Sequence, residues 1–345
     1  MAEHAPEYAR RWEARGRGRS VADEARTSYY GLPVLHKPHW NWLIIVYFFV
    51  GGLAGASYAL ASLAQLVGGA EGGRIARVGR YLALAGTLLS PLLLILDLGR
   101  PERFHHMLRV VKLRSPMSIG TWSLVVFGGF STLSALGQAA QDGLLGRRGR
   151  LARLLRALPA RLIGLLGLGP ALLVGGYTGV LLAATAVPLW TKNYLLMGPL
   201  FLTSALSNAT AAITLVLALA RGTPRRTLAR LERLEVLTLL VELALLVAAR
   251  LNLGRVIARP LTVGRLGRLY RWGVLGAGLA APLALQAPGV LAGRPPGRGT
   301  AVLAAALTLV GGFLFRYVMV VGGRQSADDP AATFALTRGR DQPRP

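Results

Sequence analysis

The sequence contains no cysteine among its 345 residues. This excludes disulfide bonds, thiolate-bound zinc and cysteine-ligated iron–sulfur clusters within the chain. Histidine is also scarce, and none lies inside an apolar segment; the five are His4, His36, His39, His105 and His106. Because a b-type haem held between membrane helices needs imidazole ligands within those helices, we expect no haem and no metal site. Any redox chemistry must then use a small-molecule carrier or the cofactors of a partner.

Charged residues are the second shortage. Only 16% of the residues are charged, whereas soluble domains carry about 25%, and 53% are hydrophobic, with a mean hydropathy of +0.46. This composition predicts a membrane protein. The net charge of +25 comes mostly from arginines scattered between apolar segments. Such scattering favours lipid head groups or topology signals over nucleic acid as the partner of these charges.

Eight apolar segments, each close to the ~20 residues that a bilayer helix requires, predict an all-α, polytopic integral membrane bundle of eight transmembrane helices. The segments are 42–66, 80–98, 117–139, 162–187, 195–219, 234–251, 271–290 and 299–322. We therefore divide the chain into a polar, Arg-rich N-terminal tail (1–38), a transmembrane domain (39–322) and a polar, mobile C-terminal tail (323–345).

An even number of spans places both termini on one side of the membrane. Lysines and arginines number 23 on that side and 16 on the other, but 12 and 16 when both tails are left out. Because the positive-inside rule is best counted over short loops, these numbers do not fix the orientation.

The most informative stretch is at the end of the second span, where Asp97 precedes Arg100. A carboxylate in the hydrocarbon region costs roughly 2.5–3.5 kcal/mol on insertion scales. We therefore expect Asp97 to form an ion pair with Arg100, one helical turn further on. Such a charged cluster at a membrane boundary usually marks a site.

Other polar and aromatic residues reach the same side of the predicted bundle. His39 and Tyr47 are two helical turns apart and would share a face, and Trp122 lies near the start of the third span. Tyr177 sits among glycines in the fourth span. Aromatic residues at this depth also serve as interface anchors, and a buried tyrosine can simply bond a backbone carbonyl, so each residue alone has a purely structural alternative.

Two acidic residues lie in the sixth span. Glu235 and Glu242 are seven residues apart and so occupy one face of a helix. Glu242 is the deeper of the two and needs a partner or a proton. It is either a step in a proton path or one half of an ion pair with an arginine elsewhere in the bundle.

Small residues are concentrated in the first span, at Gly51, Gly52, Gly55 and their alanine neighbours. Small faces let helices approach closely in lipid, so this run predicts a helix-packing surface. A phosphate-binding glycine loop is disfavoured, because no strand precedes the run.

Four motifs in sequence order resemble the NrfD/polysulfide-reductase membrane-subunit family. They are residues 47–55, 96–104, 115–122, and 177–182 with 188–190. They cover most of residues 40–220, whereas beyond residue 220 the resemblance is mainly one of hydropathy.

The resemblance implies an eight-helix, quinone-binding subunit without a redox cofactor of its own, in the cell (inner) membrane with periplasmic termini. Menaquinone or ubiquinone would be the substrate. The partner would be a ferredoxin-like iron–sulfur electron-transfer subunit, and through it a molybdopterin or multihaem catalytic subunit. The residues expected to bind quinone are His39, Tyr47, Asp97, Trp122 and Tyr177. Those expected to be catalytic are Asp97, Arg100 and Tyr177, with Asp97 and Glu242 on the proton path.

Elementary chemistry is consistent with this implication. A quinone needs hydrogen-bond partners for two carbonyls, an apolar slot for its tail and groups that exchange protons as electrons move. A solute or ion transporter is an alternative, because Pro170 and the glycines at 175–176 would suit an interrupted helix. A structural membrane anchor is another alternative.

Overall fold

The computed structural model describes residues 35, 38, 40–112, 114–146 and 149–337. Every regular element among these residues is a helix, which confirms the predicted all-α membrane bundle. The long helices are α3 (Trp42–Val67), α4 (Gly69–Asp97), α5 (Pro116–Gln141), α7 (Ala160–Ala183), α9 (Tyr194–Leu219), α10 (Arg225–Ile257), the π-helix η2 (Leu269–Ala280) with α13 (Ala281–Leu291), and α14 (Arg298–Asp328). The short helices are η1 (Pro101–Leu108), α6 (Arg150–Ala157), α8 (Pro188–Thr191), α11 (Arg259–Thr262), α12 (Gly264–Arg268) and α15 (Pro330–Thr337).

Seven helical segments of the described chain are long and apolar enough to cross a membrane. The remaining expected span, 234–251, lies inside α10, a helix of 33 residues that packs along α9 within the bundle. α10 is not among the seven, and its first nine residues hold four arginines and a glutamate. The count of eight transmembrane helices therefore stays a prediction.

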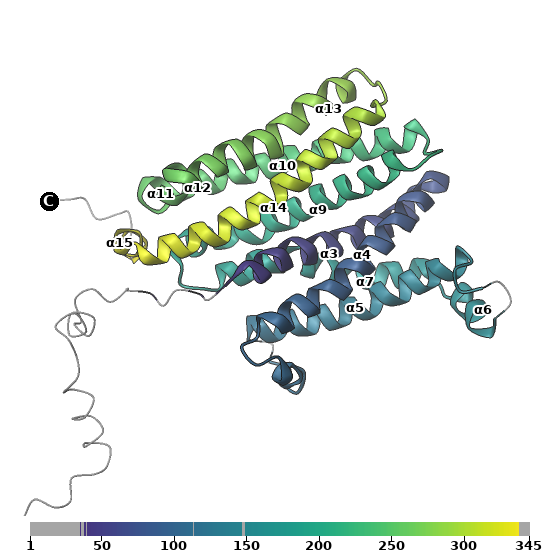
Figure 1. The fold of residues 1–345 in the computed structure, drawn as a ribbon, viewed down its shortest axis with the longest axis horizontal. Helices are drawn as coiled ribbons and strands as arrows, with labels where there is room; N and C mark the ends of the chain where they lie inside the picture. The colour runs from purple at the N-terminus through teal and green to yellow at the C-terminus, as the bar shows by residue number, and fades with distance from the viewer. Residues whose placement is uncertain (1–34, 36–37, 39, 113, 147–148, 338–345) are drawn as a thin grey trace, which may run out of the picture.

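The long helices lie side by side in two groups (Figure 1). α3, α4, α5 and α7 pack together as one group, and α9, α10, α13 and α14 form the other. α3 and α9 join the two groups, because α3 also packs on α9 and α14, and α9 on α7. The membrane segments of all four motifs therefore lie in the first group, except for the short helix α8.

The connection between α3 and α4 corrects one prediction. The predicted spans leave residues 67–80 as the connection between the first two helices, but α4 begins at Gly69, so only Gly68 separates the two helices. The Gly68 amide bonds the Ala64 carbonyl at 2.8 Å, and Gly69 has a φ of 58°, a left-handed conformation that glycine adopts without steric cost. The polar segment after the turn, with three arginines, is therefore the first part of a long helix.

The small residues of the first span form the predicted packing surface. A Cβ on Gly55 would overlap the carbonyl oxygen of Ala171 and would lie 2.9 Å from the amide nitrogen of Gly175. Both atoms belong to the α7 backbone. α3 and α7 can approach this closely only because position 55 has no side chain.

The C-terminal region also differs from the prediction. Residues from 323 on were expected to form a polar, mobile tail, but α14 continues to Asp328 and α15 follows as far as Thr337. Gly323 packs against the indole of Trp190, and Ser326 accepts a hydrogen bond from the Leu189 amide at 3.2 Å. These contacts with the buried α8 segment fix the end of α14 in the bundle.

Candidate functional site

Four of the predicted site residues lie at the same end of the first helix group. Tyr47 is in the second turn of α3, Asp97 ends α4, Trp122 is in the second turn of α5, and Tyr177 is near the end of α7. Because successive helices run in opposite directions, these positions share one end. η1 connects α4 to α5 there and packs on both. His39 lies outside the described residues.

Tyr47 and Tyr177 lie near each other at this end of the α3–α7 contact. Their side chains are 5% and 6% exposed, and the two hydroxyl groups are close enough to interact electrostatically. They arrive from helices that are 130 residues apart in the chain, through the α3–α7 packing that Gly55 permits. Two buried tyrosines from distant parts of the chain thus lie near each other inside the bundle.

The Tyr177 ring lies directly on the backbone of α5. Its hydroxyl donates a hydrogen bond to the Pro116 carbonyl, and a Cβ on Gly120 would overlap the ring. Pro116 is at the first turn of α5, where Ser115 caps the helix with a 3.5 Å bond from the Ser118 amide. Gly120 is therefore required for the position of Tyr177, a role that its place in the third motif did not indicate.

Trp122 fixes the loop that precedes α5. Its indole Nε1 donates to the Val110 carbonyl at 3.4 Å, and the Ser118 hydroxyl bonds the same carbonyl at 3.3 Å. Ser118 also accepts from the Lys112 amide at 2.9 Å. The polar atom of Trp122 thus has a backbone partner, so this side chain positions the loop rather than presenting a free donor.

The predicted ion pair between Asp97 and Arg100 does not form. α4 ends at Asp97, the backbone turns extended at Leu98 (φ −69°, ψ 127°), and Arg100 has φ −137° and ψ 84°. The helical spacing that would bring the two side chains together is therefore lost. Asp97 is partly buried, and Arg100 is exposed to the surroundings of the bundle. Between described residues, the ion pairs join Arg77 to Asp142 and Arg230 to Glu71.

Glu242 lies in the middle of the bundle, away from Asp97, and faces Arg316 on α14. Glu242 is 3% exposed and Arg316 is fully buried. Ser207 on α9 donates to the Glu242 carboxylate at 2.7 Å. Ser204 interacts with the same carboxylate and accepts from Arg316 Nη1 at 3.0 Å. We call Glu242, Arg316, Ser204 and Ser207 the central charge cluster.

The central charge cluster reaches α3 next to Tyr47. Arg316 Nε donates to the Phe48 carbonyl at 3.2 Å, and its Nη1 donates to the Gly312 carbonyl at 2.8 Å. The guanidinium also lies 5.6 Å from the ring centroid of Phe49. Arg316 was not among the predicted site residues, although a buried cation inside a membrane span is itself a signal of function.

A second acidic cluster lies on α10, nearer the N-terminal end of this helix than Glu242. Glu235 is fully buried and accepts a 2.9 Å hydrogen bond from Thr308 on α14, and Gln286 on α13 contacts the same carboxylate. Glu232, which is 5% exposed, lies one turn before it on the same face. Glu232, Glu235 and Glu242 thus form a row of buried carboxylates along α10.

The fold and these clusters define a multi-pass, all-α membrane protein with polar clusters buried in an apolar interior. The family profile described as "Polysulphide reductase, NrfD" matches residues 35–327. The chain therefore belongs to the NrfD polysulphide reductase family, which confirms the resemblance carried by the four motifs.

Two curated proteins are similar over most of their length. The C subunit of polysulfide reductase from Wolinella succinogenes is 28% identical over 302 residues, a match that covers 83% of this chain and 94% of that protein. Protein NrfD from Escherichia coli strain K12 is 29% identical over 311 residues, with 83% and 95% coverage. The match thus extends beyond the region of the four motifs, into the second helix group.

Proposed function

We propose that this chain is the membrane subunit of an oxidoreductase complex that oxidises quinol or reduces quinone. The family carries the name of a reductase, and one relative is named as a subunit of polysulfide reductase, which supports a subunit role. The observation that carries the quinone part is the Tyr47–Tyr177 pair, two hydroxyls brought together inside an apolar bundle.

The chemistry divides between these residues and a partner. A quinol that gives up two electrons also releases two protons, so its oxygens need hydrogen-bond partners that change roles during the reaction. Tyr47 and Tyr177 supply hydroxyls for this purpose. Asp97, at the exit of α4, accepts protons near the membrane boundary. His39 is a further hydrogen-bond partner that we assign to the same site.

The electrons leave or enter through a partner protein. We propose a ferredoxin-like iron–sulfur subunit on the periplasmic side of the inner membrane, where the chain termini would also lie, coupled to a molybdopterin or multihaem catalytic subunit. Menaquinone or ubiquinone is then the substrate of this chain.

The row of carboxylates on α10 supports a proton route from the opposite membrane end. The route would run from Glu232 and Glu235 to Glu242 and the central charge cluster, which contacts the α3 backbone beside Tyr47. Glu235 and Glu242 are seven residues apart, a rise of about 10.5 Å, so water must bridge them. Each group is a hydrogen-bonding side chain buried among helices that would otherwise be apolar.

The transporter alternative loses its main support. α7 is continuous from Ala160 to Ala183 and passes through Pro170 and the two glycines without interruption. The broken helix that would suit a midplane solute site is therefore not formed at that position.

Quinol-linked electron transfer in the assembled complex tests the proposal. Tyr177→Phe and Asp97→Asn should assemble normally and lose most quinol-dependent turnover, about tenfold or more if each group exchanges a proton. Tyr194→Phe is the matched control, because Tyr194 is 63% exposed at the start of α9. Wild-type turnover in both site variants would overturn the assignment, and a complex insensitive to quinone analogues would favour the structural-anchor alternative.

A further inference from the structure

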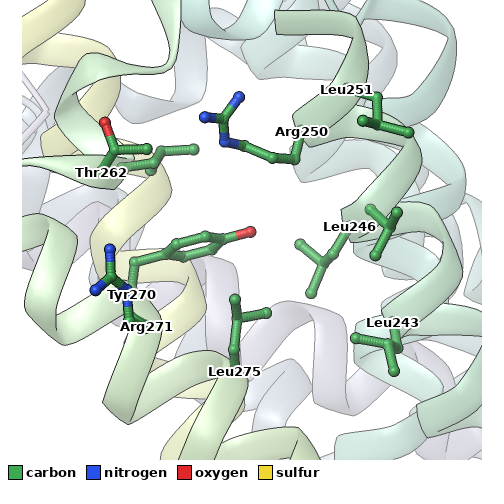
Figure 2. Close-up of a pocket in the computed structure, with 10 residues that line it drawn as sticks. Leu243, Leu246, Arg250, Leu251, Thr262, Tyr270, Arg271 and Leu275 are labelled. Carbon is green, nitrogen blue, oxygen red and sulfur yellow. The ribbon is translucent and has the colours of Figure 1, made fainter. Parts of the chain in front are cut away.

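A pocket in the second helix group lies away from the Tyr47–Tyr177 site. Its volume is about 360 Å³, and it opens between α10 and the segment from α11 to η2 (Figure 2). The α10 side supplies Leu243, Leu246, Val247, Arg250 and Leu251. The facing side supplies Leu261, Thr262, Tyr270, Arg271 and Leu275.

The polar groups of this pocket point to a ligand. Tyr270 is only 6% exposed, and Figure 2 shows its hydroxyl directed into the pocket. No hydrogen bond joins this hydroxyl to another described residue. Arg250 comes from the opposite wall and interacts electrostatically with it, while Nη1 of Arg250 donates to the Gly254 carbonyl at 3.3 Å. A buried hydroxyl and a guanidinium thus face the same space.

Both charged residues in the lining of this pocket are arginines. Residues 243–327 contain no aspartate or glutamate, and six arginines lie within residues 250–271. Arg271, which is exposed, is the second cation of the pocket wall. Asp328 and Asp329 lie in a different hollow, together with Arg259. The pocket therefore has two cations and no acidic side chain in its lining, a pattern that suits an anion from outside the chain.

The α10 wall of the pocket carries exposed apolar side chains. Val247 and Leu251 of α10 are 51% and 73% exposed, and they continue the line of Leu243 along the helix. The facing wall includes the start of η2, a π-helix of 12 residues. Most π-helical segments are single turns, and they often occur at functional sites. A ligand that fits must combine a negative head group with apolar chains.

We propose that this pocket binds an anionic phospholipid. Its phosphate lies between Arg250, Arg271 and the Tyr270 hydroxyl, and its acyl chains run along Leu243, Val247 and Leu251. A second quinone fits less well, because a neutral head group leaves two arginines without a counter-charge. The assignment is independent of the proposed reaction at Tyr47 and Tyr177.

The test measures phospholipid retained by the full-length protein in detergent, with native mass spectrometry and lipid extraction after graded delipidation. Wild-type protein should retain phosphatidylglycerol in preference to phosphatidylcholine. Arg271→Gln should reduce this retention about fivefold, and Arg250→Gln with Arg271→Gln about 25-fold, on the scale of one interfacial arginine each. The control is Arg265→Gln with Arg268→Gln, which removes two exposed arginines of α12 outside the pocket lining.

Because Arg250 also donates a hydrogen bond to the backbone, Arg250→Gln affects folding as well as the pocket. Arg271→Gln and Leu243→Trp, which fills the pocket mouth, then carry the test. Equal retention by the pocket and control variants would overturn the proposal. So would equal thermal protection by inorganic phosphate, or recovery of a quinone that depends on Tyr270.

Discussion

Glu242 on α10 and Arg316 on α14 meet through the hydroxyl of Ser204, which contacts both side chains in the middle of the bundle. Neither is exposed beyond 3%. The two charges stabilise each other, and Ser207 and two backbone carbonyls complete their hydrogen bonding. A pair of this kind is costly to break from one side only, because the remaining charge stays buried.

We therefore expect Arg316→Gln to destabilise the protein by about 3–5 kcal/mol, the usual cost of removing one partner of a buried pair. The double variant Arg316→Gln with Glu242→Gln should lose less than the sum of the two single variants. Denaturant unfolding in detergent micelles measures both quantities as a double-mutant cycle. If the losses of stability in the two single variants simply add in the double variant, the two residues do not interact and the prediction is wrong.

Close packing of α3 on α7 gives a second prediction. Gly55→Ala places a methyl group in overlap with the Ala171 carbonyl oxygen, which is backbone and cannot rotate away. We expect a loss of about 1–3 kcal/mol, typical of overpacking. Gly129→Ala on α5 is the control, because a Cβ there meets nothing within 4 Å, and its stability should be unchanged or slightly higher. Thermal unfolding of both variants checks this, and equal midpoints would contradict it.

The contact between Gly120 and Tyr177 gives a third prediction. Gly120→Ala forces the Tyr177 ring off α5, so under the proposed function quinol turnover should fall by about tenfold to a hundredfold. Steady-state turnover of the assembled complex measures this, with Gly129→Ala again as control. A variant that turns over normally, with intact assembly, would show that the ring position does not matter.

The buried carboxylates of α10 give a fourth prediction. If they carry protons, Glu235→Gln should slow the proton uptake linked to quinone reduction by about a hundredfold or more, since proton transfer by a positioned side chain typically contributes ~10²–10⁴-fold. Proton uptake by proteoliposomes is followed with a pH-sensitive dye. Glu71→Gln is the matched control, because Glu71 pairs with Arg230 in a partly exposed bridge. Equal rates in both variants would remove Glu235 from the route.

Much of the first helix group could be predicted from the sequence. The length of the apolar segments predicted the helices. The alternating direction of these helices placed Tyr47, Asp97, Trp122 and Tyr177 at one end. The Asp97–Arg100 ion pair failed because helical spacing was assumed beyond the last residue of α4, where the backbone is extended. Gly99 and Pro101 both signal the end of a helix, so the sequence itself argued against helical spacing as far as Arg100.

The second helix group was harder to predict, because its site depends on partners far apart in sequence. Glu242 was recognised as needing a counter-charge, but only the packing of α10, α9 and α14 selects Arg316 among many arginines. The connection that the predicted spans leave at 67–80 is helical for a similar reason. Its arginines suggested an exposed loop, yet Arg80 is 5% exposed and bonds Gln138 on α5 at 2.6 Å.

The wide turns of η2 make the second helix group sensitive to chain length. A π-helix holds more residues in each turn than an α-helix, so successive side chains of Leu269–Ala280 are separated by smaller angles than those of a regular helix. If this winding is kept, removing one residue from Leu269–Ala280 would turn everything after the deletion by the angular step of one residue. Gln286 would swing away from Glu235, and Gly278 would no longer face Gly311. At this place, a length change of one residue is more disruptive than most substitutions.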